Sequence, residues 1–231
     1  GQLKLLRNHV GRDFDVFFSV KANPNPAVLK VFCNEGAGLE IASAGEYVRA
    51  VRAGAPADRI LFAGPGKTDE ELSYVVDGGI GEIHVESLDE IERLSRICDQ
   101  AKKTVSVAVR VNPDASVQGG AMRMGGGATA FGLDESLLGA AIEQISIASH
   151  LSLRGLHIFS GTQILKAETL LAQWNYGVSL ARRLIKSGVR IETVDLGGGL
   201  GIPALRCLLR TLLLGRPHRL LRSSQVATNV Q

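Results

Sequence analysis

The 231-residue chain has few aromatic residues, few cysteines and no long apolar run. Three cysteines, Cys33, Cys98 and Cys207, are too few and too scattered for a disulfide framework, so a reducing, cytoplasmic compartment is expected. Cys33 and Cys98 fall within helical patterns, which favours small buried side chains over reactive thiols. No run approaches the roughly 20 apolar residues of a membrane-spanning helix, and the first residues lack the features of a secretory signal.

The net charge of +3 belongs to the last part of the sequence. Residues 204–231 hold five arginines and eight leucines but no acid, which leaves 21 basic and 23 acidic residues, a charge of −2, in the remainder. The remainder shows no basic stripe of the kind that binds nucleic acid. We therefore expect neither a nucleic-acid nor a membrane partner, with membrane-surface association of an amphipathic Leu/Arg tail as the alternative.

One unit repeats from Asp15 to about Pro203: a short β-branched run, a few polar or glycine residues, then a helical pattern. The predicted strands cover residues 16–20, 39–41, 60–62, 83–85, 105–111, 153–159 and 193–196. The predicted helices lie near residues 25–35, 43–53, 68–77, 87–102, 134–148 and 166–187, and four of them open with the cap residues Asn25, Ser43, Thr68 and Ser87. This alternation predicts a parallel sheet with covering helices, because runs such as VSVAVRV are apolar throughout.

Seven strands in about 190 residues predict an α/β fold, a (β/α)8 TIM-like barrel that is incomplete at its C-terminus. An open doubly wound sheet is the alternative, but no G-x-G-x-x-G follows the first strand. Residues 1–203 are expected to form the barrel domain, and residues 204–231 an atypical Leu/Arg-rich tail. The glycine-rich segment 112–132 interrupts the repeat, which is typical of a functional or mobile loop, with a disordered surface insertion as the alternative.

Polar residues cluster just past the carboxyl ends of the predicted strands, which share one rim in a parallel barrel. They are Lys21, Glu40 with Ser43, Lys67, Glu86 with Ser87, Arg110, Thr162 and Gly197-Gly198-Gly199. Lys21 closes the run VFFSV, and desolvation inside a barrel mouth would favour the neutral amine that Schiff-base chemistry needs. The glycine run and the turn Ser160-Gly161-Thr162 offer backbone N–H groups and a hydroxyl to an anion such as a phosphate.

The histidines give no metal-binding pattern. His84-Val85-Glu86 resembles the H-x-E of zinc deaminases, but no P-C-x-x-C follows. The five histidines show no ligand spacing, so we predict no metal site.

Six segments resemble, in order and spacing, the alanine-racemase-like barrel of ornithine and diaminopimelate decarboxylases, which are fold-type III pyridoxal-phosphate enzymes. The segments are FFSVKANPNPAVL, GLEIASAGE, IHVESLDEIERL, VAVRVNPD, GLHIFSGTQ and VDLGGGLG, and they span roughly residues 14–203. Racemases of this superfamily are less similar, because Asn23-Pro24-Asn25-Pro26 is the decarboxylase pattern. The resemblance implies pyridoxal 5'-phosphate as the cofactor, decarboxylation of an amino acid and a homodimer.

The resemblance also implies a role for each candidate residue. Lys21 would form the internal aldimine with the cofactor and later help to reprotonate the substrate carbon. Arg110 would lie near the pyridine ring, and Glu40 and Glu46 would line the pocket. The phosphate would be held by Thr162, Gly197, Gly198 and Gly199.

Two departures from the family pattern bear on activity. Phe159 stands where the family stacks a histidine on the cofactor ring, and phenylalanine can stack but cannot donate a hydrogen bond. Together with segment 112–132, Phe159 favours the branch that acts on carrier-protein-tethered aminoacyl groups.

The family's later glutamate and arginine for the cofactor, and its C-terminal β-domain, have no counterparts in this chain. We therefore expect the chain as given to be inactive, with a tail typical of a coding frame out of register. A racemase on the same barrel and a non-catalytic cofactor-binding homologue are the alternatives.

Overall fold

The computed structural model describes residues 1–11, 14–112, 122–123, 131–159 and 161–201. Most of the segment 112–132, Ser160 and the whole tail 204–231 lie outside the described residues, and so do the expectations placed on them. Within the described part, no helix is long and apolar enough to cross a membrane.

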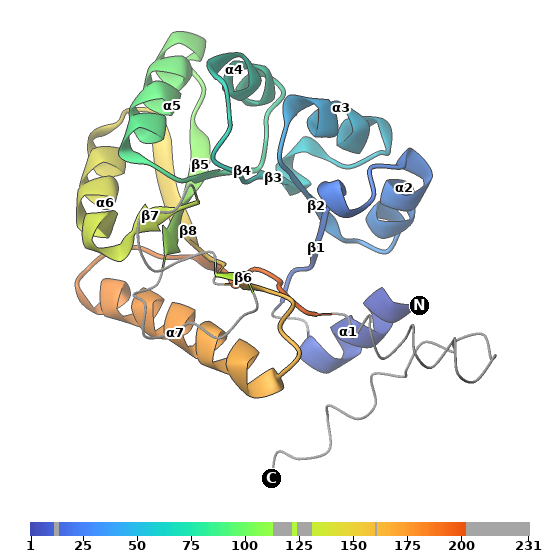
Figure 1. Cartoon of the computed structure of the whole chain (residues 1–231). Coiled ribbons are helices and arrows are strands. Elements are labelled where there is room, and N and C mark those ends of the chain that lie inside the picture. The colour runs from blue at the N-terminus through green and yellow to red at the C-terminus, as the bar shows by residue number, and fades with distance from the viewer. Residues whose placement is uncertain (12–13, 113–121, 124–130, 160, 202–231) are drawn as a thin grey trace, which may run out of the picture.

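Seven parallel strands pair in the order in which they occur along the chain, and each corresponds to a predicted strand. They are β1 (Phe17–Ser19), β2 (Gly38–Ile41), β3 (Ile60–Phe62), β4 (Glu82–Val85), β5 (Val105–Asn112), β8 (Leu151–Ile158) and β10 (Thr193–Asp195). Because each new strand is added on the same side, the sheet curls into a ring (Figure 1), whereas a doubly wound sheet reverses its order. The barrel prediction is therefore confirmed and the doubly wound alternative is wrong. Among the described strands, β10 and β1 are not paired with each other, so the ring is open between them.

The six predicted helices are all present and cover the outside of the ring (Figure 1). They are α2 (Pro26–Asn34), α3 (Ala44–Arg52), α4 (Asp69–Asp77), α5 (Leu88–Ala101), α6 (Leu138–Ile147) and α7 (Ala167–Lys186). The four predicted cap side chains each accept a backbone N–H at the start of a helix, because these donors have no partner inside the helix. At Thr68 the cap is a full capping box with Glu71.

Several short elements were not predicted. Helix α1 (Gln2–Val10) precedes the barrel, and Arg7 on it donates to the carbonyl oxygen of Glu35 at the end of α2. Strand β7 (Leu133–Asp134) pairs with the end of β5. Strands β6 (Met122–Arg123) and β9 (Gly161–Thr162) form a separate antiparallel pair, which brings part of segment 112–132 beside the Thr162 turn. Three 3-10 turns complete the described elements: η1 (Val20–Ala22), η2 (Ala57–Arg59) and η4 (Glu135–Leu137).

The two faces of the barrel strands have opposite character. Side chains that point outward against the helices form the apolar core, and Leu39, Ile60, Phe62 and Ile83 are fully buried there. Alternate residues of the same strands point into the ring, because successive strand residues face opposite sides. The buried inward-facing residues are largely polar or charged: Glu82, His84, Glu86, Arg110 and His157. The inside of the barrel is therefore rich in buried polar and charged side chains, whereas the apolar core lies between the strands and the helices.

Candidate active site

Lys21 lies at the carboxyl end of the first strand, in the turn η1 that directly follows β1. Its Nζ is 3.8 Å from Oε1 of Glu40 on the neighbouring strand β2. The same Glu40 oxygen accepts a hydrogen bond of 3.0 Å from Ser19 Oγ, since Ser19 and Glu40 are paired in the β1–β2 register. The Lys21 side chain is 67% exposed, so the described residues do not desolvate its amine as the sequence led us to expect. The amine is instead accessible and held beside a carboxylate.

Arg110 forms a buried ion pair with Glu86 at the ends of β5 and β4. Arg110 Nη1 lies 3.0 and 3.1 Å from the two carboxylate oxygens of Glu86. Glu86 also accepts the backbone N–H groups of Gly64 at 2.6 Å and Gly132 at 3.0 Å, which ties three successive loops together. The Arg110 guanidinium lies 5.6 Å from the ring centre of Phe159, and its buried Nε has no hydrogen-bond partner among the described atoms.

The two predicted glycine turns lie against each other. Gly197 and Gly199 have positive φ angles of 64° and 86°, a region that other residues rarely adopt. A Cβ atom on Gly199 would lie 2.4 Å from the carbonyl oxygen of Gly161, whereas one on Gly198 would meet nothing within 4 Å. The next residue after Gly161, Thr162, has a buried Oγ1 with no partner among the described atoms. This turn therefore combines close backbone approach with an unused hydroxyl group.

One donor of the glycine run is already occupied. The backbone N–H of Gly197 donates to Oδ1 of Asp195 at 2.7 Å. Gly197 therefore contributes its backbone conformation, and the predicted anion-binding role is left to Gly198, Gly199 and Thr162.

Several rim residues predicted from the sequence have structural contacts instead. Lys67 is buried and donates to Glu90 at 2.5 Å and to the carbonyl oxygens of Gly64 and His84, so it does not face the barrel mouth. Glu46 accepts the backbone N–H of Ala42 at 2.7 Å. Ser43 and Ser87 are helix caps.

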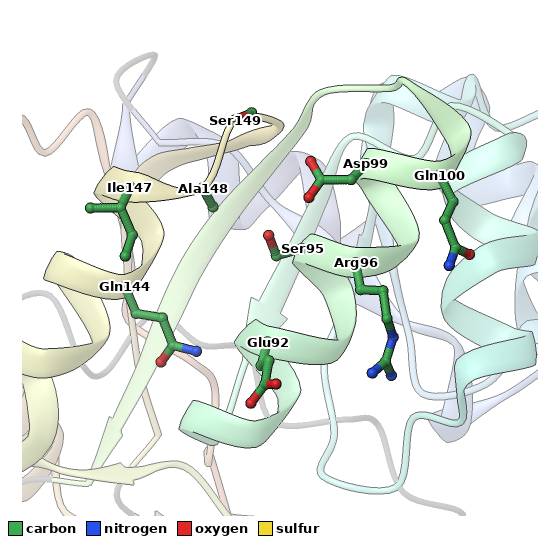
Figure 2. A pocket seen from close by; sticks show the side chains of 9 residues that line it. All are labelled: Glu92, Ser95, Arg96, Asp99, Gln100, Gln144, Ile147, Ala148 and Ser149. Atoms are coloured by element: carbon green, nitrogen blue, oxygen red, sulfur yellow. The ribbon is translucent and has the colours of Figure 1, made fainter.

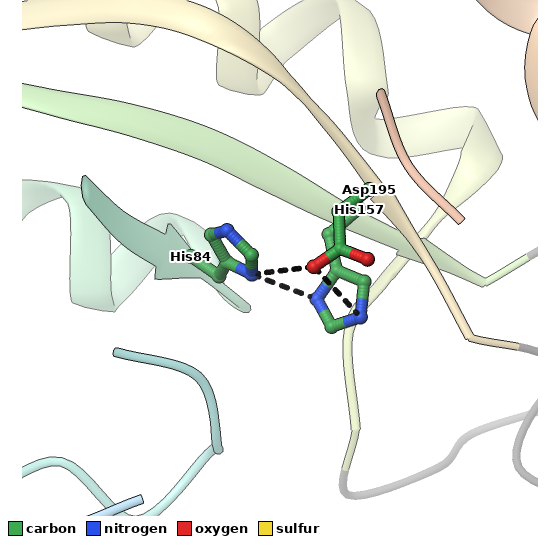
Figure 3. Close-up of side chains that lie close together, drawn as sticks. All are labelled: His84, His157 and Asp195. Atoms are coloured by element: carbon green, nitrogen blue, oxygen red, sulfur yellow. Dashed lines mark hydrogen bonds and ion pairs between the residues drawn. The ribbon is translucent and has the colours of Figure 1, made fainter. Parts of the chain in front are cut away.

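A buried cluster of His84, His157 and Asp195 joins β4, β8 and β10 inside the ring (Figure 3). The two Nδ1 atoms of the histidines are 3.0 Å apart, and His84 Nε2 is 2.9 Å from Oε1 of Glu82. Asp195 Oδ2 lies 3.8 Å from His84 Nδ1 and 4.0 Å from His157 Nε2. The segment EIHVE carries a signal for this cluster, because its polar residues alternate with apolar ones, which places Glu82, His84 and Glu86 on one face of the strand.

Burial and nearby charge act differently on the members of this cluster. Burial opposes protonation of His84, but the carboxylates of Glu82 and Asp195 outweigh it and raise the pKa of His84. Burial lowers the pKa of His157 to about 3, so this ring is neutral near neutral pH. Burial alone would raise the pKa of Asp195, but the adjacent imidazoles and the Gly197 N–H lower it.

A hollow on the outer surface is unrelated to the predicted site. A groove of about 580 Å³ runs between α5 and α6 and is lined by residues such as Arg96, Asp99, Gln144 and Ile147 (Figure 2). It lies on the outer helices and contains none of the predicted site residues. The carboxyl ends of the strands therefore remain the candidate site.

Comparison with known proteins gives the family. The model of the pyridoxal-dependent decarboxylase, pyridoxal binding domain, matches residues 2–206. The chain belongs to this family. Among its relatives is the L-glutamyl-[BtrI acyl-carrier protein] decarboxylase of Niallia circulans, 37% identical over 86% of this chain and 46% of the relative. The diaminopimelate decarboxylase of Zymomonas mobilis is 40% identical over 81% of this chain and 45% of that enzyme.

Solved structures agree on the fold. The diaminopimelate decarboxylase of Helicobacter pylori, crystallised with L-lysine, matches with a TM-score of 0.79 at 25% identity, over 87% of this chain and 52% of that one. The chain thus spans about half the length of the curated relatives it matches.

The family implies pyridoxal phosphate, and the described residues fit it. An anionic phosphate needs several donors and close backbone approach, which the glycine turn and the unpartnered Thr162 hydroxyl offer. An aldehyde needs an accessible amine, and Lys21 is exposed at the carboxyl ends of the same ring of strands.

Proposed function

We propose that this chain is the cofactor-binding barrel of a pyridoxal-phosphate-dependent amino-acid decarboxylase, with Lys21 as the residue that binds the cofactor. The observation that carries the proposal is the presence of an accessible amine and an unpartnered buried hydroxyl, both directly after barrel strands. Lys21 presents an exposed amine beside Glu40, and the Thr162 hydroxyl is buried without a partner, next in the chain to the Gly161 backbone that contacts the glycine turn. No hydrogen bond within the described structure explains why a hydroxyl should be buried there, and an anion would supply the missing partner.

Each residue of the site has a defined part in this proposal. Bound pyridoxal phosphate supplies the electron sink that makes loss of a carboxylate possible. The Lys21 amine holds the cofactor aldehyde, and Glu40 keeps that amine oriented through the contact of 3.8 Å. Gly198, Gly199 and Thr162 bind the phosphate. Arg110 is fixed by Glu86 and places positive charge beside the Phe159 ring, which supplies an apolar surface against which a planar ring can stack.

Chemical labelling tests the assignment of Lys21. We expect incubation with pyridoxal phosphate, reduction with borohydride and peptide mapping to place the label on Lys21. The Lys21→Ala variant should lose the label, and Lys30→Ala, which changes an exposed lysine on α2, should keep it. A label on Lys30 or Lys67, or a folded chain that takes up no label, would contradict the assignment.

We propose further that the substrate is an aminoacyl group tethered to a carrier protein. Phe159 supports this because the site offers ring contact without the hydrogen bond of a histidine, and the N. circulans relative is named for such a substrate. The similarity to the Z. mobilis enzyme makes free diaminopimelate the competing substrate.

A full-length relative that carries the counterparts of Phe159 and segment 112–132 distinguishes these substrates. We expect a higher kcat/KM for decarboxylation of the carrier-bound substrate than for free diaminopimelate, ornithine or lysine. Equal or better turnover of a free diamino acid would contradict the tethered substrate and leave decarboxylation standing. A product that keeps its carboxylate would indicate a racemase instead.

A further inference from the structure

We propose that His84, His157 and Asp195 bind one divalent transition-metal ion, best matched by Zn²⁺, inside the barrel. The described residues bring together one group of this kind, with a ligand atom from each side chain lying within 4.8 Å of the others. The three side chains come from three different strands and point toward a common centre (Figure 3). The proposal concerns side chains other than the cofactor residues, although Asp195 contacts Gly197, and it does not depend on the proposed function.

The ligand types and distances suit zinc. Zinc binds histidine nitrogen and carboxylate oxygen at about 2.0–2.1 Å, which puts neighbouring ligand atoms of a tetrahedral site roughly 3.3 Å apart. The distances here are 3.0 Å between the histidine Nδ1 atoms and 3.8 Å between His84 Nδ1 and Asp195 Oδ2. All three ligand atoms lie within 4.8 Å of one another, which is wider than a tetrahedral site, so His157 and Asp195 must move closer together to surround one ion. The described residues supply three protein ligands, which leaves one tetrahedral position for water.

A second layer of contacts is already in place. His84 uses its far nitrogen, Nε2, to contact Oε1 of Glu82 at 2.9 Å. This arrangement of carboxylate, histidine and metal fixes the tautomer and the ring orientation of a ligand histidine. Glu82 Oε2 is in turn 3.7 Å from Arg154 Nη1, so the outer carboxylate has its own charged neighbour.

The hydrogen-bond pattern shows that the cluster suits a cation at its centre. If both histidines are neutral and His84 donates through Nε2 to Glu82, then His84 Nδ1 can only accept, and His157 Nδ1 must donate to it. His157 Nε2 would then be a bare acceptor facing the Asp195 carboxylate, which is repulsive. A metal ion resolves this mismatch, and so would an additional proton on His84. A bound metal ion and a proton on His84 can be distinguished by metal analysis and by NMR.

The metal would have a defined structural effect. Asp195 Oδ1 accepts the Gly197 N–H, while its Oδ2 faces the histidines, so a bound ion would fix the start of the glycine turn through one carboxylate. The Asp195 side chain, 26% exposed, is the most accessible member of the cluster, whereas His84 is fully buried.

Metal analysis of the purified chain, without added pyridoxal phosphate, tests the site. We expect close to one Zn²⁺ per chain, and Co²⁺ in its place should give the visible absorption of a tetrahedral site. His84→Gln, His157→Gln and Asp195→Asn should each weaken Zn²⁺ binding by about 100-fold or more, and Glu82→Gln by about 10-fold to 100-fold. The control is His150→Gln, which changes a partly exposed histidine that contacts Asp99 on the outer surface and should leave affinity unchanged.

X-ray absorption on the Co²⁺-loaded wild-type chain gives a result that does not depend on the variants folding. Two imidazole ligands support the proposal. A folded wild-type chain that binds neither ion, or affinity that is the same in the ligand variants and in His150→Gln, overturns it. Nitrogen-15 NMR that shows His84 doubly protonated in the presence of excess Zn²⁺ also overturns it, because the proton then occupies the site.

Discussion

Replacement of Lys67 by methionine is expected to destabilise the fold strongly, although the sequence places this lysine among the candidate site residues. Lys67 and Glu90 are almost completely buried, with side-chain exposures of 1% and 3%. The three N–H donors of Lys67 are used by Glu90 and by the carbonyl oxygens of Gly64 and His84. Methionine fills a similar volume but leaves the Glu90 carboxylate buried without its cation.

The expected magnitude follows from that uncompensated charge. Removing one partner of a buried ion pair costs about 3–5 kcal/mol, whereas an exposed pair contributes about 0–1 kcal/mol. The matched control is therefore Lys103→Met, since Lys103 pairs with Asp77 and both side chains are substantially exposed. The double variant Lys67→Met, Glu90→Gln removes both charges and keeps an oxygen that can accept the Glu86 N–H. Its cost should fall below the sum of the single variants by about 2 kcal/mol.

The loss of stability in Lys67→Met should also depend on pH, and it should be larger at higher pH. Burial raises the pKa of Glu90 above its ordinary value of 4.5, and Lys67 partly opposes that effect. Loss of Lys67 raises this pKa further. A carboxyl group with a higher pKa in the folded state binds more protons when folded, so stability falls as pH rises from the unfolded toward the folded pKa. Lys67→Met should therefore lose more stability at about pH 7 than at about pH 5.

Urea unfolding followed by circular dichroism at both pH values measures these free energies. A Lys67→Met cost as small as that of Lys103→Met, or a strictly additive double variant, would refute the reasoning. A cost that shrinks as pH rises would show that Glu90 is not the group responsible.

Two further predictions concern the glycine turn and the stacking position. Gly199→Ala forces a side chain into a positive φ and against Gly161, so pyridoxal-phosphate affinity, measured by fluorescence titration, should fall at least tenfold. Gly188→Ala, which also has a positive φ and open space for a Cβ but follows α7 outside the site, is the control, and equal losses in both variants would contradict the steric argument. Phe159→His puts a hydrogen-bonding ring beside Arg110, and the same change in a full-length relative should shift kcat/KM toward free diamino acids. An unchanged ratio between free and carrier-bound substrates would remove Phe159 from the specificity argument.

The strands, the helices and their order could be predicted from the sequence because the signals are local. Buried parallel strands are apolar runs. The start of a helix is indicated by a cap residue such as Thr68 together with a glutamate three residues later. Helix α1 was not predicted, although Leu3, Leu6 and Val10 have the spacing of one helix face, and its described contacts with the barrel include polar ones, such as that of Arg7 with Glu35. A contact of this kind depends on a partner 28 positions away and leaves no local pattern.

Only part of the site could be predicted, because the burial and partners of its side chains also depend on residues far away in the sequence. Lys21 and Lys67 both follow the end of a barrel strand, and nothing adjacent to either distinguishes an exposed amine from a buried one. The difference comes from Glu90, 23 residues beyond Lys67, which gives that lysine a buried counter-ion. His84 and His157 are 73 residues apart and meet only because the sheet curls, so ligand spacing along the chain could not reveal them.

Asp195 connects the two sites, and this decides how variants of the cluster must be interpreted. One carboxylate oxygen accepts the N–H of Gly197 and the other faces the buried histidines. Asp195→Asn therefore alters the start of the glycine turn as well as the cluster, and a loss of cofactor affinity in that variant has two explanations. His84→Gln changes the cluster alone, because His84 lies on β4 and its described polar side-chain contacts are with Glu82, His157 and Asp195. If the occupant of the cluster orders the glycine turn, His84→Gln must weaken the binding of phosphate-bearing ligands while the turn's own residues are intact. If cofactor affinity is unchanged in His84→Gln and reduced in Asp195→Asn, the carboxylate orders the turn directly, and the buried site serves only to join the three strands.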